Sequence, residues 1–119
     1  MKNLSAMTDN ELRDYETESK AKFDDSIMDT TTAFGHVGGT DAECDELLQT
    51  LIAIDCEKWS RDNFNYRPSA DEREKWVERV ESSRAKLAKA EATGNRERIY
   101  RARYMVERAV SAVAFIESK

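Results

Sequence analysis

Cysteine and histidine are the first residues to consider for chemistry, because they are the common side-chain nucleophiles and nitrogen or sulfur metal ligands. Cys44 and Cys56 lie twelve residues apart on what we predict to be one helix. That spacing separates them by about 18 Å along an unbroken helix, too far for a disulfide or a shared metal ion. His36 is the only histidine, so a site of several imidazoles is excluded. We predict no metal and no cofactor.

Two pairs of glutamates have a spacing that places both carboxylates on one side of a helix. They are Glu43 with Glu46, and Glu78 with Glu81. The spacing resembles part of the Glu-x-x-Glu…Glu-x-x-Asp pattern of the all-α nucleotide pyrophosphohydrolases, whose carboxylates hold magnesium. The expected Asp is absent, and Glu43 and Glu46 fall on the solvated side of their helix. A magnesium-dependent hydrolase is therefore the less favoured alternative, and we predict that the protein is not an enzyme.

The charges of this 119-residue chain are divided unequally between its two halves. Residues 1–57 hold 14 Asp and Glu against 4 Lys and Arg, whereas residues 58–119 hold 10 against 15. The formal net charge of the whole chain is −5. An acidic half followed by a basic half predicts electrostatic pairing, either between helices of one fold or with a partner.

The leading functional hypothesis is a small non-enzymatic protein-binding module, an inhibitor or regulator that docks an acidic surface on a basic, nucleic-acid-handling partner. Its carboxylates would stand in place of phosphates, as in immunity proteins that block nucleases. We expect such a protein in a phage or another mobile element. The candidate contact residues surround a glycine-rich loop and are Asp24, Asp25, Asp29, Asp41, Glu43, Asp45 and Glu46.

A second candidate interface lies on the last predicted helix, opposite its apolar stripe. It consists of Tyr100, Arg101, Tyr104, Arg108 and Phe115. Tyr and Arg are enriched at the centres of protein interfaces. The face could be covered by the first helix, form a homodimer, or bind nucleic acid through stacking and phosphate contacts. Nucleic acid is less favoured, because an acidic protein repels phosphates at long range.

Hydrophobic periodicity and helix-start signals predict an all-α fold. We expect one domain over residues 1–119, an antiparallel bundle of about four helices at 9–33, 41–63, 70–92 and 96–117, with residues 1–7 as a flexible tail. Three capping-box motifs, which begin at Thr8, Thr40 and Ser69, mark helix starts. The short turn around Gly94 makes the last two helices an antiparallel hairpin.

Five charged residues fall within the apolar stripes of the second and third helices: Asp55, Lys58, Asp62, Arg73 and Arg84. Because a buried unpaired charge is costly, each must form a pair or stay hydrated. If these two helices are antiparallel, Arg73 comes within reach of Asp55 or Asp62. The sequence leaves open whether such pairs fix the helix register or line a ligand cleft.

The chain begins without an apolar run of signal-peptide length, and no segment approaches the roughly 20 apolar residues of a membrane span. We therefore expect a cytoplasmic protein with reduced thiols and no membrane partner.

Overall fold

The computed structural model describes residues 3–28, 30–32, 35–62 and 66–118, and over these residues it confirms the predicted all-α bundle. The helices are α1 (Asp9–Ser26), α2 (Asp41–Arg61), α3 (Arg73–Thr93) and α4 (Arg96–Glu117). Two 3₁₀ turns, η1 (Leu4–Ala6) and η2 (Ala70–Glu72), precede α1 and α3, and a hairpin of β1 (Thr30–Thr32) and β2 (Gly35–Val37) separates α1 from α2. None of the described helices is both long and apolar enough to cross a membrane.

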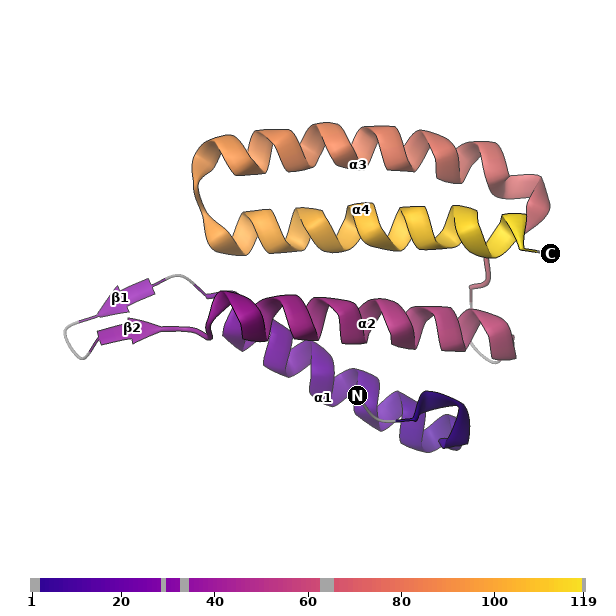
Figure 1. Cartoon of the computed structure of the whole chain (residues 1–119), viewed down its shortest axis with the longest axis horizontal. Coiled ribbons are helices and arrows are strands. Elements are labelled where there is room, and N and C mark those ends of the chain that lie inside the picture. The colour runs from indigo at the N-terminus through magenta and orange to yellow at the C-terminus, as the bar shows by residue number, and fades with distance from the viewer. Residues whose placement is uncertain (1–2, 29, 33–34, 63–65, 119) are drawn as a thin grey trace.

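The helices form a flat stack in which α4 is central. It lies between α3, its antiparallel hairpin partner, and α2, while α1 crosses α2 (Figure 1). Chain direction alternates from each helix to the next, so α2 and α4 run parallel where they pack together (Figure 1). The overall dimensions are 51 × 34 × 20 Å. This arrangement lets residues on α4 contact both the acidic helices and α3.

The first helix is shorter than the predicted range of 9–33. It ends at Ser26, and Thr30–Thr32 instead pair antiparallel with Gly35–Val37. Three consecutive threonines favour a strand, because their β-branched side chains lose rotamer freedom in a helix and fit a pleated strand. The prediction of a helix beyond residue 26 is therefore wrong. The hairpin projects from the end of the bundle (Figure 1).

The three predicted capping boxes form to different extents. The Thr8 hydroxyl accepts a hydrogen bond from the Glu11 N–H at 3.1 Å, and the Glu11 carboxylate accepts one from the Thr8 N–H at 3.0 Å. Thr40 makes only the first of these bonds, to the N–H of Glu43 at 3.1 Å. Ser69 makes no side-chain cap, and the chain enters α3 through η2. The prediction that Ser69 caps a helix is therefore wrong, although α3 begins four residues later, at Arg73.

The apolar core has two clusters, one at each end of the α2–α4 contact. The cluster near the hairpin contains Phe23, Ile27, Cys44, Leu48, Leu51 and Tyr100. The cluster at the far end contains Trp59, Trp76, Ala109, Ala112 and Ile116. Both cysteines are free thiols on α2; Cys44 is fully buried in the first cluster, as expected for a small apolar side chain.

The turn η1 is joined to α2 by Arg61. Its Nη2 donates to the Leu4 carbonyl at 2.8 Å, and its Nη1 donates to the Asp9 carboxylate at 3.1 Å. The flexibility of residues 1–7 stays a prediction.

Candidate protein-binding surface

The arginines of α4 form ion pairs with the two acidic helices. The nitrogen–oxygen distances are 3.6 Å for Arg96–Asp41, 3.2 Å for Arg101–Asp24, 3.0 Å for Arg103–Asp45 and 3.5 Å for Arg108–Asp55. The Arg101 and Arg103 pairs are largely exposed, and exposed pairs contribute only about 0–1 kcal/mol each, whereas the Asp55 carboxylate of the Arg108 pair is buried. Their main consequence is that part of the acidic half is already neutralised by the basic half of the same chain.

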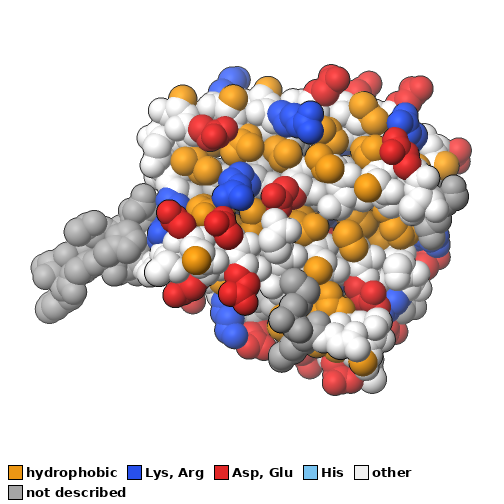
Figure 2. Space-filling view, in the orientation of Figure 1, with side chains coloured by type: hydrophobic (Ala, Val, Ile, Leu, Met, Phe, Trp, Pro, Cys, Tyr) orange, Lys and Arg blue, Asp and Glu red, His pale blue; other side chains and the backbone are white. Residues whose placement is uncertain are grey.

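The seven predicted acidic contact residues therefore fall into three groups. Those paired with α4 are Asp24, Asp41 and Asp45. Asp29 lies outside the described residues. The remaining carboxylates, which form no ion pair within the described part of the chain, are Asp25, Glu43 and Glu46. Figure 2 shows acidic side chains gathered near the end of the bundle where α2 begins.

The three remaining carboxylates surround a shallow depression where α1 ends and α2 begins. Two adjoining hollows of about 320 and 330 Å³ share Asp25, Ser26 and Glu43 in their walls. The first hollow extends over Glu46 and the half-buried Leu47, and the second extends toward Met28, Gly38 and Gly39. We call the surface formed by Asp25, Glu43 and Glu46 the acidic trough.

Lys22 also borders the acidic trough, but its charge is engaged elsewhere. Its ammonium forms an ion pair with Glu18 at 2.8 Å, and the hydrogen bond that it donates to this carboxylate raises the pKa of Lys22. The Glu43 carboxylate lies directly over Gly39, where an added Cβ would be 2.6 Å from Oε2. The trough is therefore a negatively charged concavity with a small apolar contribution from Leu47.

Asp25 lies at a position that does not favour helix stability. The C-terminal end of a helix carries partial negative charge, so a carboxylate in the last turn is unfavourable. The last turn of α1 has no basic residue, and it contains Asp24 and Asp25. Arg101 compensates Asp24 at 3.2 Å, whereas Asp25 has no such pair among the described residues. A residue that breaks a local rule without structural compensation is a candidate for function.

The second candidate interface is mostly internal. Tyr100 is 6% exposed and donates to the Asp45 carboxylate at 2.8 Å. Burial and this bond raise the pKa of Tyr100 to about 12, and the same hydrogen bond lowers the pKa of Asp45. Tyr104 donates to Asp55 at 2.5 Å, and Phe115 packs on a buried tryptophan. The structure supports a central α4, but α2 rather than the first helix covers most of this face.

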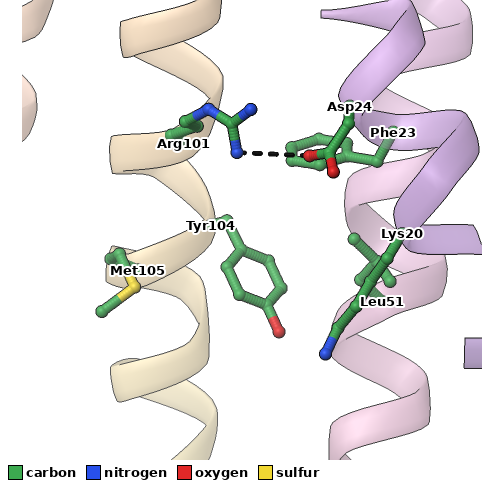
Figure 3. A pocket seen from close by; sticks show the side chains of 7 residues that line it. All are labelled: Lys20, Phe23, Asp24, Leu51, Arg101, Tyr104 and Met105. Atoms are coloured by element: carbon green, nitrogen blue, oxygen red, sulfur yellow. Dashed lines mark hydrogen bonds and ion pairs between the residues drawn. The ribbon is translucent and has the colours of Figure 1, made fainter. Parts of the chain in front are cut away.

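One groove stays open where α1 and α4 flank α2 (Figure 3). Its volume is about 410 Å³, and its walls are formed by Lys20, Phe23, Asp24, Leu51, Arg101, Tyr104 and Met105. The Arg101–Asp24 ion pair bridges the two flanking helices at one end (Figure 3). Met105 is 53% exposed at the edge. Arg101 and Tyr104 are thus the members of the second candidate interface that reach this surface.

Asp55 belongs to a buried network between α2 and α4. It is 6% exposed and accepts from Tyr104, with the Nε of Arg108 at 3.5 Å. Burial raises the pKa of Asp55, although Tyr104 and Arg108 act in the opposite direction. The Arg108 guanidinium lies 5.6 Å from the ring centroids of Trp59 and Trp76. The network joins α2 to α4, so it can fix the register between these two helices.

The other charges in the apolar stripes have different partners or are exposed. Lys58 pairs with Glu16 at 2.8 Å. Arg73 pairs with Glu117 at 2.6 Å, and Asp62 pairs with Arg67 at 3.2 Å. Arg84 is exposed. The predicted contact of Arg73 with Asp55 or Asp62 is therefore wrong, because α4 rather than α3 packs along α2.

The two glutamate pairs also stay apart. Glu43 and Glu46 lie at the start of α2, and Glu78 and Glu81 lie on α3, with α4 between these helices (Figure 1). Within the described ranges, no three His, Cys, Asp or Glu side chains come together closely enough to hold a metal ion. Comparison of the chain with protein-family models, curated proteins and solved structures found no match.

The sequence prediction did not identify Arg96 as a residue that shapes this surface. This residue bonds the backbone that carries the acidic trough, as described below. A signal was present: Arg96 is the first residue of α4, where a cation opposes the helix dipole.

Proposed function

We propose that the protein is a small non-enzymatic module that docks its acidic trough on a basic surface of a partner protein. The observation that carries the proposal is the set of carboxylates at Asp25, Glu43 and Glu46, which have no ion pair among the described residues. Neighbouring carboxylates are paired with arginines of α4. Like charges held together repel one another, and a basic partner relieves that repulsion on binding.

The shape and charge of the trough suit lysine and arginine side chains. A carboxylate can accept two parallel hydrogen bonds from one guanidinium. The apolar stems of both side chains can pack on Leu47 and Met28, which border the two hollows. The net charge of −5 also speeds the encounter with a basic partner, in a manner that salt weakens.

Nucleic-acid-handling proteins are the class of partner that we favour, since they present basic surfaces that bind phosphates. Carboxylates in the trough would take the place of those phosphates, so the protein acts as an inhibitor or regulator. A cytoplasmic location and an origin in a phage or another mobile element belong to the same proposal.

The test is capture of partners by the tagged protein from host lysate, with and without nuclease, using two matched variants. Asp25→Lys/Glu46→Lys reverses the trough, whereas Glu78→Lys/Glu81→Lys reverses two exposed carboxylates on α3. Both change the net charge equally. The proposal predicts a nuclease-resistant protein partner that is lost only with the trough variant. Equal capture by the two variants would contradict it.

Nucleic-acid binding through α4 has less support. Arg96, Arg101, Arg103 and Arg108 are engaged by carboxylates of α1 and α2, so they are less able to follow phosphates. A gel shift at low salt tests this alternative.

A homodimer through α4 is favoured by Met105 and Val110, which are 53% and 42% exposed on this helix. Sedimentation velocity over a range of protein concentrations tests it. A pyrophosphate-release assay with magnesium tests the hydrolase alternative.

A further inference from the structure

Arg96 binds the backbone of the crossover from α1 to α2. Its Nη1 donates to the Gly39 carbonyl at 2.7 Å, and its Nη2 donates to the carbonyls of Ser26 at 3.0 Å and Met28 at 2.6 Å. Its side chain is 16% exposed and lies 3.6 Å from the Asp41 carboxylate. One guanidinium thus joins the last residue of α1, the segment after it and the segment before α2.

The Ser26 carbonyl is the focus of these contacts. As the end of α1 it carries part of the negative charge of the helix dipole, which a cation stabilises. It also accepts from the Gly39 N–H at 2.9 Å and from the Cys44 thiol at 3.1 Å. Arg96 opposes the dipole of its own helix but satisfies the carbonyl end of another. Its position is therefore explained by the crossover rather than by α4.

The crossover is closely packed around this arginine. Gly38 has φ +129°, a conformation that residues with a side chain rarely adopt. A Cβ at Gly38 would lie 2.1 Å from the Met28 carbonyl oxygen and 2.5 Å from Nη2 of Arg96. Only glycine allows the two backbone segments and the guanidinium to approach one another so closely.

We infer that Arg96 is a positioning residue: by binding the crossover backbone, it sets the shape of the acidic trough. Arg96 donates to the carbonyls of Ser26 and Gly39. Asp25 directly precedes Ser26 in the chain, and the Glu43 carboxylate lies over Gly39. The consequence for binding rests on the proposed function. The dependence of the crossover on Arg96 does not, so it can be tested without a partner.

The two native thiols report on the crossover. Cys44 is fully buried and bonded to the Ser26 carbonyl, whereas Cys56 lies farther along α2 in the other half of the core. Arg96→Ala should open the crossover locally and raise the rate of Cys44 alkylation by about tenfold or more, since at least one charge-assisted hydrogen bond is lost. The Cys56 rate, measured by mass spectrometry in the same sample, should not change.

Two further variants control this experiment. Arg103→Ala removes the same charge and an α4–α2 ion pair, but Arg103 bonds a side chain rather than the crossover backbone. It should leave the ratio of Cys44 to Cys56 labelling unchanged. Arg96→Lys keeps the charge without the fork of donors and should give an intermediate ratio. It also covers the case in which Arg96→Ala does not fold. An unchanged ratio, or an equal rise at both thiols, would overturn the inference.

Binding provides a second readout, with hexa-arginine peptide as the probe in fluorescence anisotropy. Arg96→Ala makes the chain more negative, which alone would strengthen binding of a cationic peptide. The inference predicts weaker binding instead, because the trough loses its shape. Equal or tighter binding would contradict the positioning role. If Asp25→Lys/Glu46→Lys also leaves peptide affinity unchanged, the proposed function fails while the thiol result still decides the role of Arg96.

Discussion

Replacing Tyr104 with phenylalanine should reduce the free energy of unfolding by about 2 kcal/mol, since hydrogen bonds to charged groups contribute about 1.5–3 kcal/mol. The Tyr104 hydroxyl donates to the Asp55 carboxylate at 2.5 Å, and Asp55 is only 6% exposed. Without the hydroxyl, the carboxylate keeps Arg108 at 3.5 Å but loses its shortest bond. Because Asp55 is buried, water cannot readily replace the bond that Tyr104 donated.

The same network allows a double-mutant cycle. Asp55→Ala should cost about 3 kcal/mol, since removing one partner of a buried pair leaves the other charge uncompensated. The double variant Asp55→Ala/Tyr104→Phe should cost less than the two single losses added together, by about 1–2 kcal/mol. Urea unfolding followed by tryptophan fluorescence suits this test, because Trp59 and Trp76 are each 2% exposed beside Arg108.

Tyr66→Phe is the matched control. Tyr66 also donates to a carboxylate, that of Glu72, but it is 40% exposed, so water can replace the bond. Tyr66→Phe should therefore lower the free energy of unfolding by less than about 0.5 kcal/mol. If Tyr104→Phe is no more destabilising than Tyr66→Phe, or if the cycle is additive, the Asp55 network does not hold α2 to α4 as described.

Three further outcomes follow from the structure. Because burial raises the pKa of Asp55, the folded state binds a proton at this carboxylate more tightly than the unfolded state does. The free energy of unfolding of the wild-type protein, relative to that of Asp55→Asn, should therefore fall as pH rises from about 4 through the raised pKa. Urea unfolding of both proteins at several pH values measures this difference. Gly38→Ala should lower the melting temperature much more than Gly94→Ala, since a Cβ at Gly38 meets backbone whereas nothing lies within 4 Å of one at Gly94. Thr40→Ala should cost about 1 kcal/mol in thermal unfolding through loss of its cap, whereas Ser69→Ala, which makes no cap bond, should cost almost nothing.

The helix boundaries that the sequence predicts best are those marked by residues next to them in the chain. For α4, the side chain of Asn95 caps the start, and Gly94 before it has φ +67°, so the turn from α3 is specified by two adjacent residues. The start of α2 at Asp41 follows the Thr40 cap in the same way. Such signals act within one helical turn, so they can be recognised without knowing the tertiary structure.

The end of α1 could not be placed in the same way. The apolar residues Phe23 and Ile27 continue a helical period, and serine and threonine residues beyond them interrupt it only weakly. What ends the helix is partly the β preference of Thr30–Thr32 and partly Arg96, which bonds the Ser26 carbonyl from a distant part of the chain. A contact between residues 26 and 96 depends on the packing of α4 and has no local signature.

The sequence prediction also assigned too many carboxylates to the partner-binding surface, for a related reason. The sequence shows that an acidic half and a basic half exist, but the ion pairs depend on α2 packing against α4 and on α1 packing against α2. That packing assigns Asp24, Asp41 and Asp45 to arginines of the same chain. The surface offered to a partner is therefore narrower than the predicted one.

The central claim is that the acidic trough binds a basic partner, and affinity for the captured partner tests it most directly. Calorimetric titration should compare wild type, Asp25→Lys/Glu46→Lys and Glu78→Lys/Glu81→Lys in the same buffer. Charge reversal at a contact should lower affinity by about 100-fold or more. The account predicts this loss for the trough variant and only a small, salt-sensitive change for the α3 variant. Equal affinities of the two variants would show that net charge, rather than the trough, governs binding, and would contradict the account.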